Sequence, residues 1–180
     1  SEESFEGASV AATALGEMGA KEGVDALIKA VTKQLPVKTR ANVVKLESMK
    51  ALAKIKDPKA VDALIKVLTT SADEQDFFLN REAALALGGF ADPKAVPALI
   101  RGLFLSGRGA NIYQECRMGL VAIGPPAVDK LVEAMQRKFT ELEEDGKKYE
   151  YYPGVIVQKC ADLLGDISSV KAVPALLEQL

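Results

Sequence analysis

Apolar residues recur at helical spacing along most of the chain. In residues 57–68, DPKAVDALIKVL, the apolar residues Val61, Leu64, Ile65 and Leu68 stand at positions i, i+3, i+4 and i+7. An α-helix turns once every 3.6 residues, so these side chains share one face of a helix. Residues 39–55, which come just before, also carry apolar positions and contain no proline. The pattern therefore predicts two helices joined by a tight turn.

The same pattern is repeated along the chain. Residues 92–103 read DPKAVPALIRGL, nearly a copy of 57–68, and weaker copies bring the total to five: 14–31, 51–68, 86–103, 119–135 and 163–180. Their leading leucines (Leu15, Leu52, Leu87, Leu120 and Leu164) are 37, 35, 33 and 44 residues apart. A helical pattern with such a period indicates an α-solenoid, in which neighbouring repeats bury one another's apolar faces.

The repeats also carry helix-start signals. Asp57 and Asp92 precede the second helix of their repeats, where a carboxylate accepts hydrogen bonds from free backbone amides. Pro58 and Pro93 follow, at a position where the missing N–H costs nothing. In the fifth copy we expect Ser169 to take the capping place.

The stretch ALGGFADPKAVPALIRGL (86–103) and its four relatives resemble the HEAT-repeat class, in particular the short bacterial form also seen in phycobilin-lyase subunits. The resemblance implies an all-α fold, a right-handed α-solenoid of about five two-helix repeats in one domain, 1–180. It is specific for the fold and weakly informative about activity, since scaffolds, adaptors and a few enzymes share it. The expected repeats are 4–34, 38–70, 75–105, 111–136 and 153–180, with an insertion at 137–152.

Three connections depart from the minimum length: 69–80, 106–111 and 136–154. Residues 106–111, SGRGAN, predict a flexible linker. In the stretch 136–154 we expect one helix to extend through Glu144, a turn at Asp145–Gly146, and a return through three tyrosines.

The first helix contains the apolar run 8–15 and looks buried on both sides. We therefore expect a piece of a longer array, or end-to-end self-association; the alternative is a tolerated alanine-rich surface.

Composition narrows the chemistry. The 180 residues include no histidine, which removes the commonest general base and metal ligand, and we expect no catalytic residues, metal or cofactor. The net charge of −2 argues against nucleic-acid binding, and no apolar run is long enough to span a membrane. Cys116 and Cys160 each lie four residues before the leading leucine, where the other repeats also have small residues. We interpret them as reduced, structural thiols of a cytoplasmic protein.

Two groups of residues are candidates for binding another protein. The exposed side of the second helices carries cations in the first three repeats, and these could steer an acidic partner segment; the alternative is an ordinary solvated face. The tyrosines of the insertion could anchor an interface, or pack against the insertion itself. The candidate residues are Lys29, Lys59, Lys66, Lys94, Arg101, Tyr149, Tyr151 and Tyr152.

The leading hypothesis is a non-enzymatic scaffold or adaptor that binds another protein along its curved repeat surface. One alternative, implied by the resemblance, is a subunit similar to the phycobilin lyases, acting on a tetrapyrrole attached to a carrier protein. A second alternative is a structural spacer within a larger multidomain protein.

Overall fold

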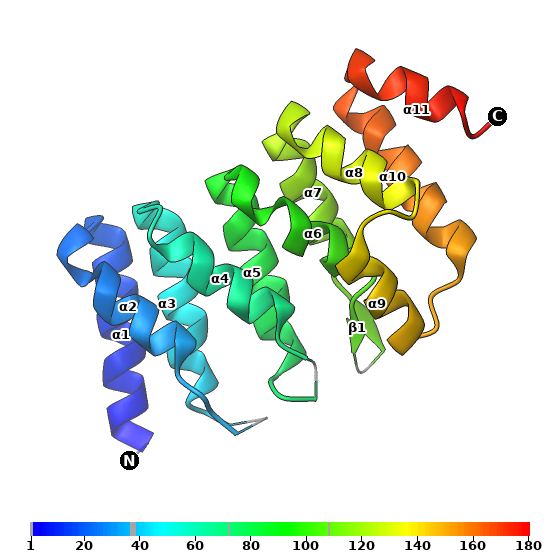
Figure 1. The fold of residues 1–180 in the computed structure, drawn as a ribbon. Helices are drawn as coiled ribbons and strands as arrows, with labels where there is room; N and C mark the ends of the chain where they lie inside the picture. The colour runs from blue at the N-terminus through cyan, green and yellow to red at the C-terminus, as the bar shows by residue number, and fades with distance from the viewer. Residues whose placement is uncertain (1, 37–38, 72, 108) are drawn as a thin grey trace.

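A computed structural model describes residues 2–36, 39–71, 73–107 and 109–180, and this part of the chain is built from pairs of helices (Figure 1). The first helices of the pairs are α1 (Glu2–Met18), α3 (Asn42–Ile55), α5 (Phe77–Phe90), α7 (Tyr113–Ile123) and α10 (Pro153–Ile167). The second helices are α2 (Val24–Thr32), α4 (Ala60–Thr69), α6 (Val96–Gly102), α8 (Val128–Met135) and α11 (Val173–Leu177). The predicted all-α solenoid of five helix pairs is confirmed. Residue 38, where the second repeat was expected to begin, lies outside the described residues.

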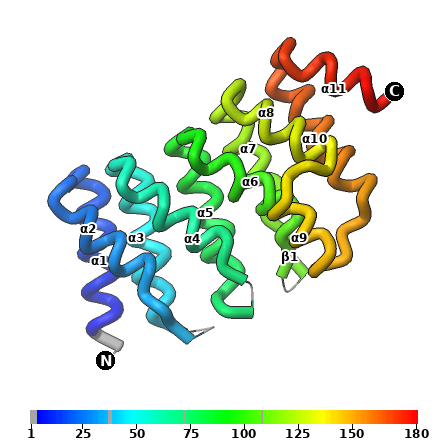
Figure 2. The backbone as a smooth tube through the Cα atoms, viewed as in Figure 1, coloured from blue at the N-terminus to red at the C-terminus, as the bar shows by residue number. Residues whose placement is uncertain are grey.

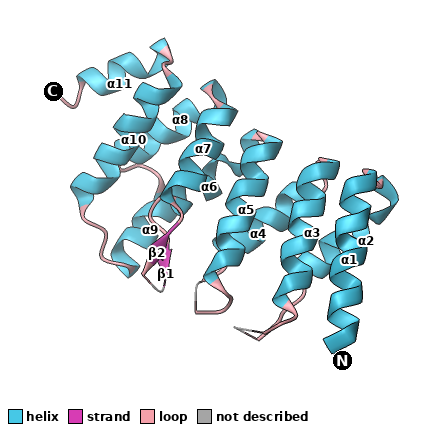
Figure 3. Ribbon diagram, turned by 180° about the vertical axis from the view of Figure 1, so that it is seen from behind, coloured by secondary structure: helices cyan, strands magenta, loops and turns pink. Residues whose placement is uncertain are grey.

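The helices form two layers along the array. Each first helix packs on the first helix of the next repeat, and the second helices α2, α4, α6 and α8 pack in the same order. Figure 1 shows the layer of second helices in front, and Figure 3, seen from behind, shows the first helices. The turns within repeats lie along one edge and the connections between repeats along the opposite edge (Figure 2). Chain segments of neighbouring repeats are therefore brought together at this second edge.

The apolar stripes meet between the layers. Val61, Leu64 and Leu68 are all at most 1% exposed, as the helical spacing predicted. Equivalent valines stand at the first or second position of the second helix in every repeat: Val24, Val61, Val96, Val128 and Val173. Four of them are buried, whereas Val173 in the last layer is 48% exposed. Burial of each stripe thus depends on the neighbouring repeat.

The turn from first to second helix is built alike in all five repeats. Each first helix is followed by a residue with positive φ, four positions after the leading leucine: Gly19, Lys56, Ala91, Gly124 and Ser168. The second helix then begins with a short 3₁₀ turn in four repeats: Lys21–Gly23, Pro93–Ala95, Pro125–Ala127 and Val170–Ala172. A left-handed residue ends a helix by turning the chain out of its axis. This shared turn keeps the two layers in register.

The predicted aspartate caps are confirmed, and the serine cap is wrong in part. The carboxylates of Asp57 and Asp92 accept hydrogen bonds from the backbone amides of Lys59 and Lys94, at 3.0 and 2.9 Å. Ser169 occupies the capping place, but its side chain makes no capping hydrogen bond. The extended backbone at this position is enough to begin the last 3₁₀ turn.

Close backbone approaches connect neighbouring helices. A Cβ atom on Gly102 of α6 would lie 2.5 Å from the sulfur of Cys116 in α7. Gly88 and Gly119 meet where α5 crosses α7, and a Cβ on Gly88 would lie 3.1 Å from the Cα of Gly119. Glycine is needed at these contacts because they leave no room for a side chain.

The predicted linker at 106–111 is a short β-hairpin. Its strands β1 (Ser106–Gly107) and β2 (Ala110–Asn111) pair antiparallel, with Ser106 opposite Asn111 and Gly107 opposite Ala110. Residue 108 lies outside the described residues. The hairpin follows α6 at the edge where the repeats are connected (Figure 1).

The insertion also differs from the prediction. The helix does not extend through Glu144: α8 ends at Met135, and a separate helix α9 (Thr140–Lys148) runs through the expected turn at 145–146. Arg137, which lies between the two helices, has φ 60° and so interrupts the helical backbone. Phe139 and Leu142 are buried, at 1% and 0% exposed. The new helix direction lets both side chains enter the core.

The first helix is not buried on both sides. Ala12 and Gly16 of α1 are buried against the array, whereas Val10 is 68% exposed. Ala11, which stands at the small-residue position shared with Cys116 and Cys160, is also exposed. The apolar run therefore has one packed and one open face in this chain.

Candidate binding groove

A hollow opens at the edge where the repeats are connected, beside the insertion. It consists of two adjoining cavities, of about 480 and 370 Å3, which share Ser71, Leu105, Tyr149 and Tyr151 in their walls. We call this hollow the tyrosine groove. Its walls come from the end of α4, the connection to α5, the end of α6, β1, α9 and the start of α10. Three stretches of chain distant in sequence, 66–74, 98–107 and 145–159, are thus needed to form it.

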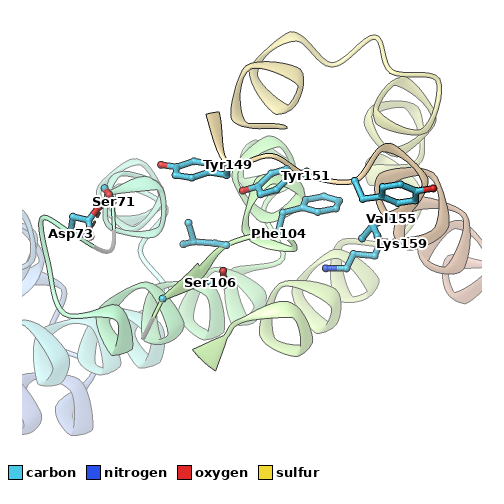
Figure 4. Close-up of a pocket in the computed structure, with 11 residues that line it drawn as sticks. Ser71, Asp73, Phe104, Ser106, Tyr149, Tyr151, Val155 and Lys159 are labelled. Carbon is cyan, nitrogen blue, oxygen red and sulfur yellow. Dashed lines mark hydrogen bonds between the residues drawn. The ribbon is translucent and has the colours of Figure 1, made fainter. Parts of the chain in front are cut away.

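Aromatic rings line one side of the groove. The ring of Tyr151 stacks on Phe104, with centroids 5.3 Å apart, and on Tyr149, with centroids 5.9 Å apart. Figure 4 shows the three rings in a row, with Ser71 and Asp73 near one end, Lys159 near the other, and Ser106 across from the row. Such offset stacking is favourable and holds the rings in fixed positions. The groove therefore has a preformed aromatic wall.

The exposure of the three insertion tyrosines differs. Tyr149 and Tyr152 are 44% and 75% exposed, and Tyr151 is half-buried. Burial raises the pKa of Tyr151 to about 12. Tyr151 thus packs between Phe104 of the third repeat and Tyr149 of the insertion, while Tyr149 and Tyr152 remain more exposed.

Lys159 of α10 closes one end of the aromatic row. Its Nζ atom lies 4.7 Å from the ring centroids of both Phe104 and Tyr113, and donates a 2.7 Å hydrogen bond to the carbonyl oxygen of Leu103. Burial lowers the pKa of this amine. The carbonyl lies just after the end of α6, where helix geometry leaves acceptors free. Lys159 thus joins α10 to α6 and fixes the position of Phe104.

A bidentate ion pair joins α9 to the repeat array. The Nε and Nη2 atoms of Arg101 donate to the two carboxylate oxygens of Asp145, at 2.5 and 3.0 Å. A second pair, Arg137 with Glu143, connects the start of the insertion to α9. The hydrogen bonds to Asp145 raise the pKa of Arg101. The hydrogen bonds from Arg137 lower the pKa of Glu143. These pairs hold the tyrosines against the groove.

The far end of the groove, at α4, carries positive charge. Lys66 is exposed and lines the wall there, and it also shares a small cavity with the buried Lys45 of α3. Burial, and then the charge of Lys66, lower the pKa of Lys45. Two cations close enough to repel each other favour an anion at this end.

Two of the predicted cations have partners in the preceding repeat. Lys59 lies 3.9 Å from Asp25, and Lys94 lies 3.2 Å from Asp62. The same pair recurs between Lys171 and Asp129 at 2.6 Å. At the equivalent junction of the third and fourth repeats, both positions are proline, Pro97 and Pro126. We call these three ion pairs, each between the second helices of successive repeats, the ion-pair ladder.

The structure divides the eight predicted binding residues into groups. Lys66, Arg101, Tyr149, Tyr151 and Tyr152 come together at the tyrosine groove, whereas Lys59 and Lys94 lie in the ladder. Lys29 is exposed on α2, away from the groove-lining residues. Arg101 is engaged by Asp145, so Lys66 is the predicted groove cation without an ion pair among the residues that the structure describes. Binding by any of them stays a prediction.

Sequence reasoning missed Phe104, Lys159 and the role of Asp145. Phe104 lies in the stretch LFL after the third repeat, and Lys159 interrupts the apolar run VIVQKC. A lysine inside an apolar run was the available signal, since its charge needs a partner. Nothing in the sequence showed that the partners would be an aromatic ring and a helix end.

The two cysteines are the remaining side chains with candidate chemistry outside the groove. Cys116 and Cys160 are free and fully buried, and burial raises the pKa of both thiols, that of Cys160 to about 12. Over residues 2–36, 39–71, 73–107 and 109–180, no three acidic or cysteine side chains gather as a metal site would require. In the same residues, no helix has the length and apolar character needed to cross a membrane. The tyrosine groove is therefore the feature with the most specific geometry.

Comparison with known families agrees with this architecture. Residues 1–76 match the model described as HEAT repeats, and residues 79–104 match the PBS lyase HEAT-like repeat. No curated protein matches the chain. The two matches together span the first three helix pairs, whose repeated turn and stacking are described above. The chain belongs to the HEAT-repeat family.

Proposed function

We propose that this protein is a non-enzymatic scaffold that binds another protein in the tyrosine groove. The observation that carries the proposal is the preformed aromatic wall, Phe104, Tyr151 and Tyr149, with the exposed Tyr152 beside it. Tyrosine and phenylalanine are enriched in interfaces because they bury a large area with few rotatable bonds. HEAT repeats, as a rigid array, keep this wall in one shape before the partner arrives.

The charges around the groove support a partner with an acidic segment. Lys66 lines the groove and is exposed, whereas Lys29, on α2, is not among the residues that line it. Exposed cations of this kind mainly raise the association rate and fall in effect as salt is added. We assign Lys59, Lys94 and Arg101 to holding the repeats and α9 together, because each already contacts a carboxylate.

The test is affinity capture with wild type, a groove variant and a matched control. The groove variant is Tyr149→Ala/Tyr152→Ala, and the control is Phe78→Ala, which removes another aromatic residue that is 43% exposed but lies outside the tyrosine groove. We expect one or more proteins to be retained by wild type and control and lost by the groove variant. The same result must hold with the purified partner. Equal retention by all three proteins would show that binding does not use the groove.

The second candidate is a subunit similar to the phycobilin lyases. It is favoured by the PBS lyase HEAT-like match, which ends at Phe104 in the groove wall, and by a cavity of about 480 Å3, within the usual range for small-molecule sites. Mixing the protein with a bilin should then shift the visible absorbance of the pigment, and Tyr149→Ala/Tyr152→Ala should abolish the shift. An unchanged spectrum would reject this second candidate, and the scaffold proposal would then be the one that remains.

A further inference from the structure

We infer that the partner segment in the tyrosine groove is proline-rich and extended, with an acidic residue directed toward Lys66. This inference rests on the proposed function, because it specifies the chemistry of the protein bound there. Three features carry it: the spacing of the rings, the kind of hydrogen-bonding groups in the walls, and the distribution of charge along the groove.

The aromatic wall has the size of one turn of a polyproline II helix. Successive ring centroids, from Phe104 through Tyr151 to Tyr149, are 5.3 and 5.9 Å apart. Three residues of a polyproline II helix rise about 9 Å, so one turn is close in length to the row, in which Phe104, 8% exposed, backs the more exposed Tyr151 and Tyr149. Proline rings pack well on aromatic faces, and grooves lined with aromatic side chains are the common way in which such segments are recognised. The exposed Tyr152 extends the surface beyond the row.

The hydrogen-bonding groups of the walls also suit proline. A proline residue has a carbonyl acceptor and no N–H donor, so its groove should offer donors. The walls carry the hydroxyls of Tyr149, Tyr151 and Tyr152 and the ammonium group of Lys66. Lys159 and Arg101 are engaged by Leu103 and Asp145, so the donors offered to the partner include the tyrosines, Lys66, Lys148 and Ser106.

A β-strand partner fits the groove less well. Strand addition needs a free sheet edge, and β1 is the strand that borders the groove. It contains two residues, Ser106 and Gly107, which supply too few backbone groups for a stable added strand. The remaining walls are helices and their ends, whose backbone groups are largely used within the helices. An extended segment without backbone donors is the better match.

Charge gives the segment a direction. In the aromatic cavity the charged lining residues are Asp73 and Lys159, which balance each other. The adjoining cavity adds Lys66 and Lys148 against Glu74, once Arg101 and Asp145 have neutralised one another. Positive charge therefore exceeds negative charge at the α4 end. An acidic residue following the prolines would lie there, next to Lys66.

The two cavities adjoin, which favours a chain over a compact ligand. They share four wall residues, Ser71, Leu105, Tyr149 and Tyr151, so a segment that passes over these side chains occupies both cavities between α10 and α4. A segment about six residues long, at roughly 3.1 Å per residue, can reach from the aromatic wall to Lys66. The combination of prolines and a nearby acidic residue is therefore the specific chemistry that we assign to the partner.

The experiment uses three synthetic peptides labelled with fluorescein. The first has eight prolines followed by two aspartates, the second replaces the prolines with glycine and serine, and the third replaces the aspartates with lysines. Fluorescence anisotropy measures binding to the intact protein at low salt. The chain has four tyrosines and no tryptophan, so unlabelled peptides can also be followed by tyrosine emission. All four tyrosines line the groove or contact Lys159.

We expect the proline–aspartate peptide to bind and to change the tyrosine emission. Loss of the prolines, or Tyr149→Ala/Tyr152→Ala, should weaken binding about tenfold or more, as removal of interface aromatics typically does. Exchange of aspartate for lysine, or Lys66→Glu, should weaken it about threefold or more and remove most of its salt dependence. Phe78→Ala should bind like wild type. Both replaced tyrosines are exposed, and an unchanged thermal midpoint verifies that the groove variant is folded.

Two results would overturn the inference. If the proline and the glycine–serine peptides bind equally, or if neither binds, the groove does not select proline-rich segments. If the proline peptide binds without affecting tyrosine emission and equally well to the groove variant, it binds elsewhere. In either case a partner lost from the groove variant in the capture experiment would still support the scaffold proposal, so the two failures can be told apart.

Discussion

The guanidinium group of Arg101 and the carboxylate of Asp145 form a bidentate contact between α6 and α9, with hydrogen bonds of 2.5 and 3.0 Å. The residues are 44 positions apart in sequence. Their side chains are 34% and 18% exposed, so water screens the contact only in part. This pair connects the insertion to the regular repeats and positions the tyrosines that follow α9.

We first predict that Arg101 and Asp145 are energetically coupled. A double-mutant cycle with Arg101→Ala and Asp145→Ala should give a coupling of about 1 kcal/mol in urea unfolding, since bidentate, partly buried pairs exceed ordinary surface pairs. Amide hydrogen exchange in residues 140–148 should accelerate in either single variant. The pair Lys50 and Glu47, within α3, is the control, and its removal should leave exchange in α9 unchanged. Additive single variants would contradict this role.

The second prediction concerns the turn after each first helix. Ala91 has φ 51°, a left-handed conformation in which a Cβ atom is strained and glycine is not. Ala91→Gly should therefore stabilise the protein by about 0.5–1 kcal/mol, although glycine usually weakens helices. Ala14→Gly, in the exposed interior of α1, should cost about 1 kcal/mol. Thermal unfolding of both variants checks the difference in sign.

The third prediction tests the close contact between α6 and α7. In Gly102→Ala, the new Cβ would meet the sulfur of Cys116 at 2.5 Å, and such overpacking costs about 1–3 kcal/mol. Adding Cys116→Ala should recover part of this loss by making room. Gly89→Ala is the control, because nothing lies within 4 Å of its added Cβ, and it should stabilise α5 by about 0.5–1 kcal/mol. Equal effects of the two glycine substitutions would refute a tight contact.

The fourth prediction extends the ion-pair ladder. Pro97 and Pro126 occupy the positions at which other junctions pair aspartate with lysine. Pro97→Asp and Pro126→Lys should together show a favourable coupling of about 0.5 kcal/mol at low salt, because exposed pairs are weak. The coupling should vanish in 1 M salt, where screening acts within about 3 Å. A coupling that persists in high salt would mean that the two side chains interact by packing instead.

The fifth prediction concerns alkaline pH. Burial raises the pKa of Cys116, and raises that of Cys160 to about 12, whereas an unfolded thiol titrates near 8.5. Stability from keeping these thiols neutral is thus fully present below about pH 8.5 and is lost as the pH rises toward 12. At pH 10 the loss is about 2 kcal/mol per thiol. Urea unfolding at pH 7.5 and 10 should show a smaller pH effect in Cys116→Ala/Cys160→Ala than in wild type.

Much of the architecture followed from the sequence because the repeat unit is local. Positions such as Val61, Leu64 and Leu68 share a helix face by spacing alone, and Asp57 caps its helix through an amide two residues away. Five copies of one unit also imply that the units stack, since none can bury its own stripe. The helix pairs and their order were thus determined by short-range patterns.

The tertiary structure decided the insertion, the hairpin and the groove. α9 became a separate helix because Phe139 and Leu142 enter the core and Asp145 reaches Arg101, and these contacts join residues far apart in the chain. Likewise, Lys159 contacts the carbonyl oxygen of Leu103 and the ring of Phe104 because α10 packs beside the end of α6. The sequence determined the features that depend on residues a few positions apart, namely the helix faces and the aspartate caps. Three-dimensional packing decided which distant side chains share a cavity, because that depends on the path of the whole array.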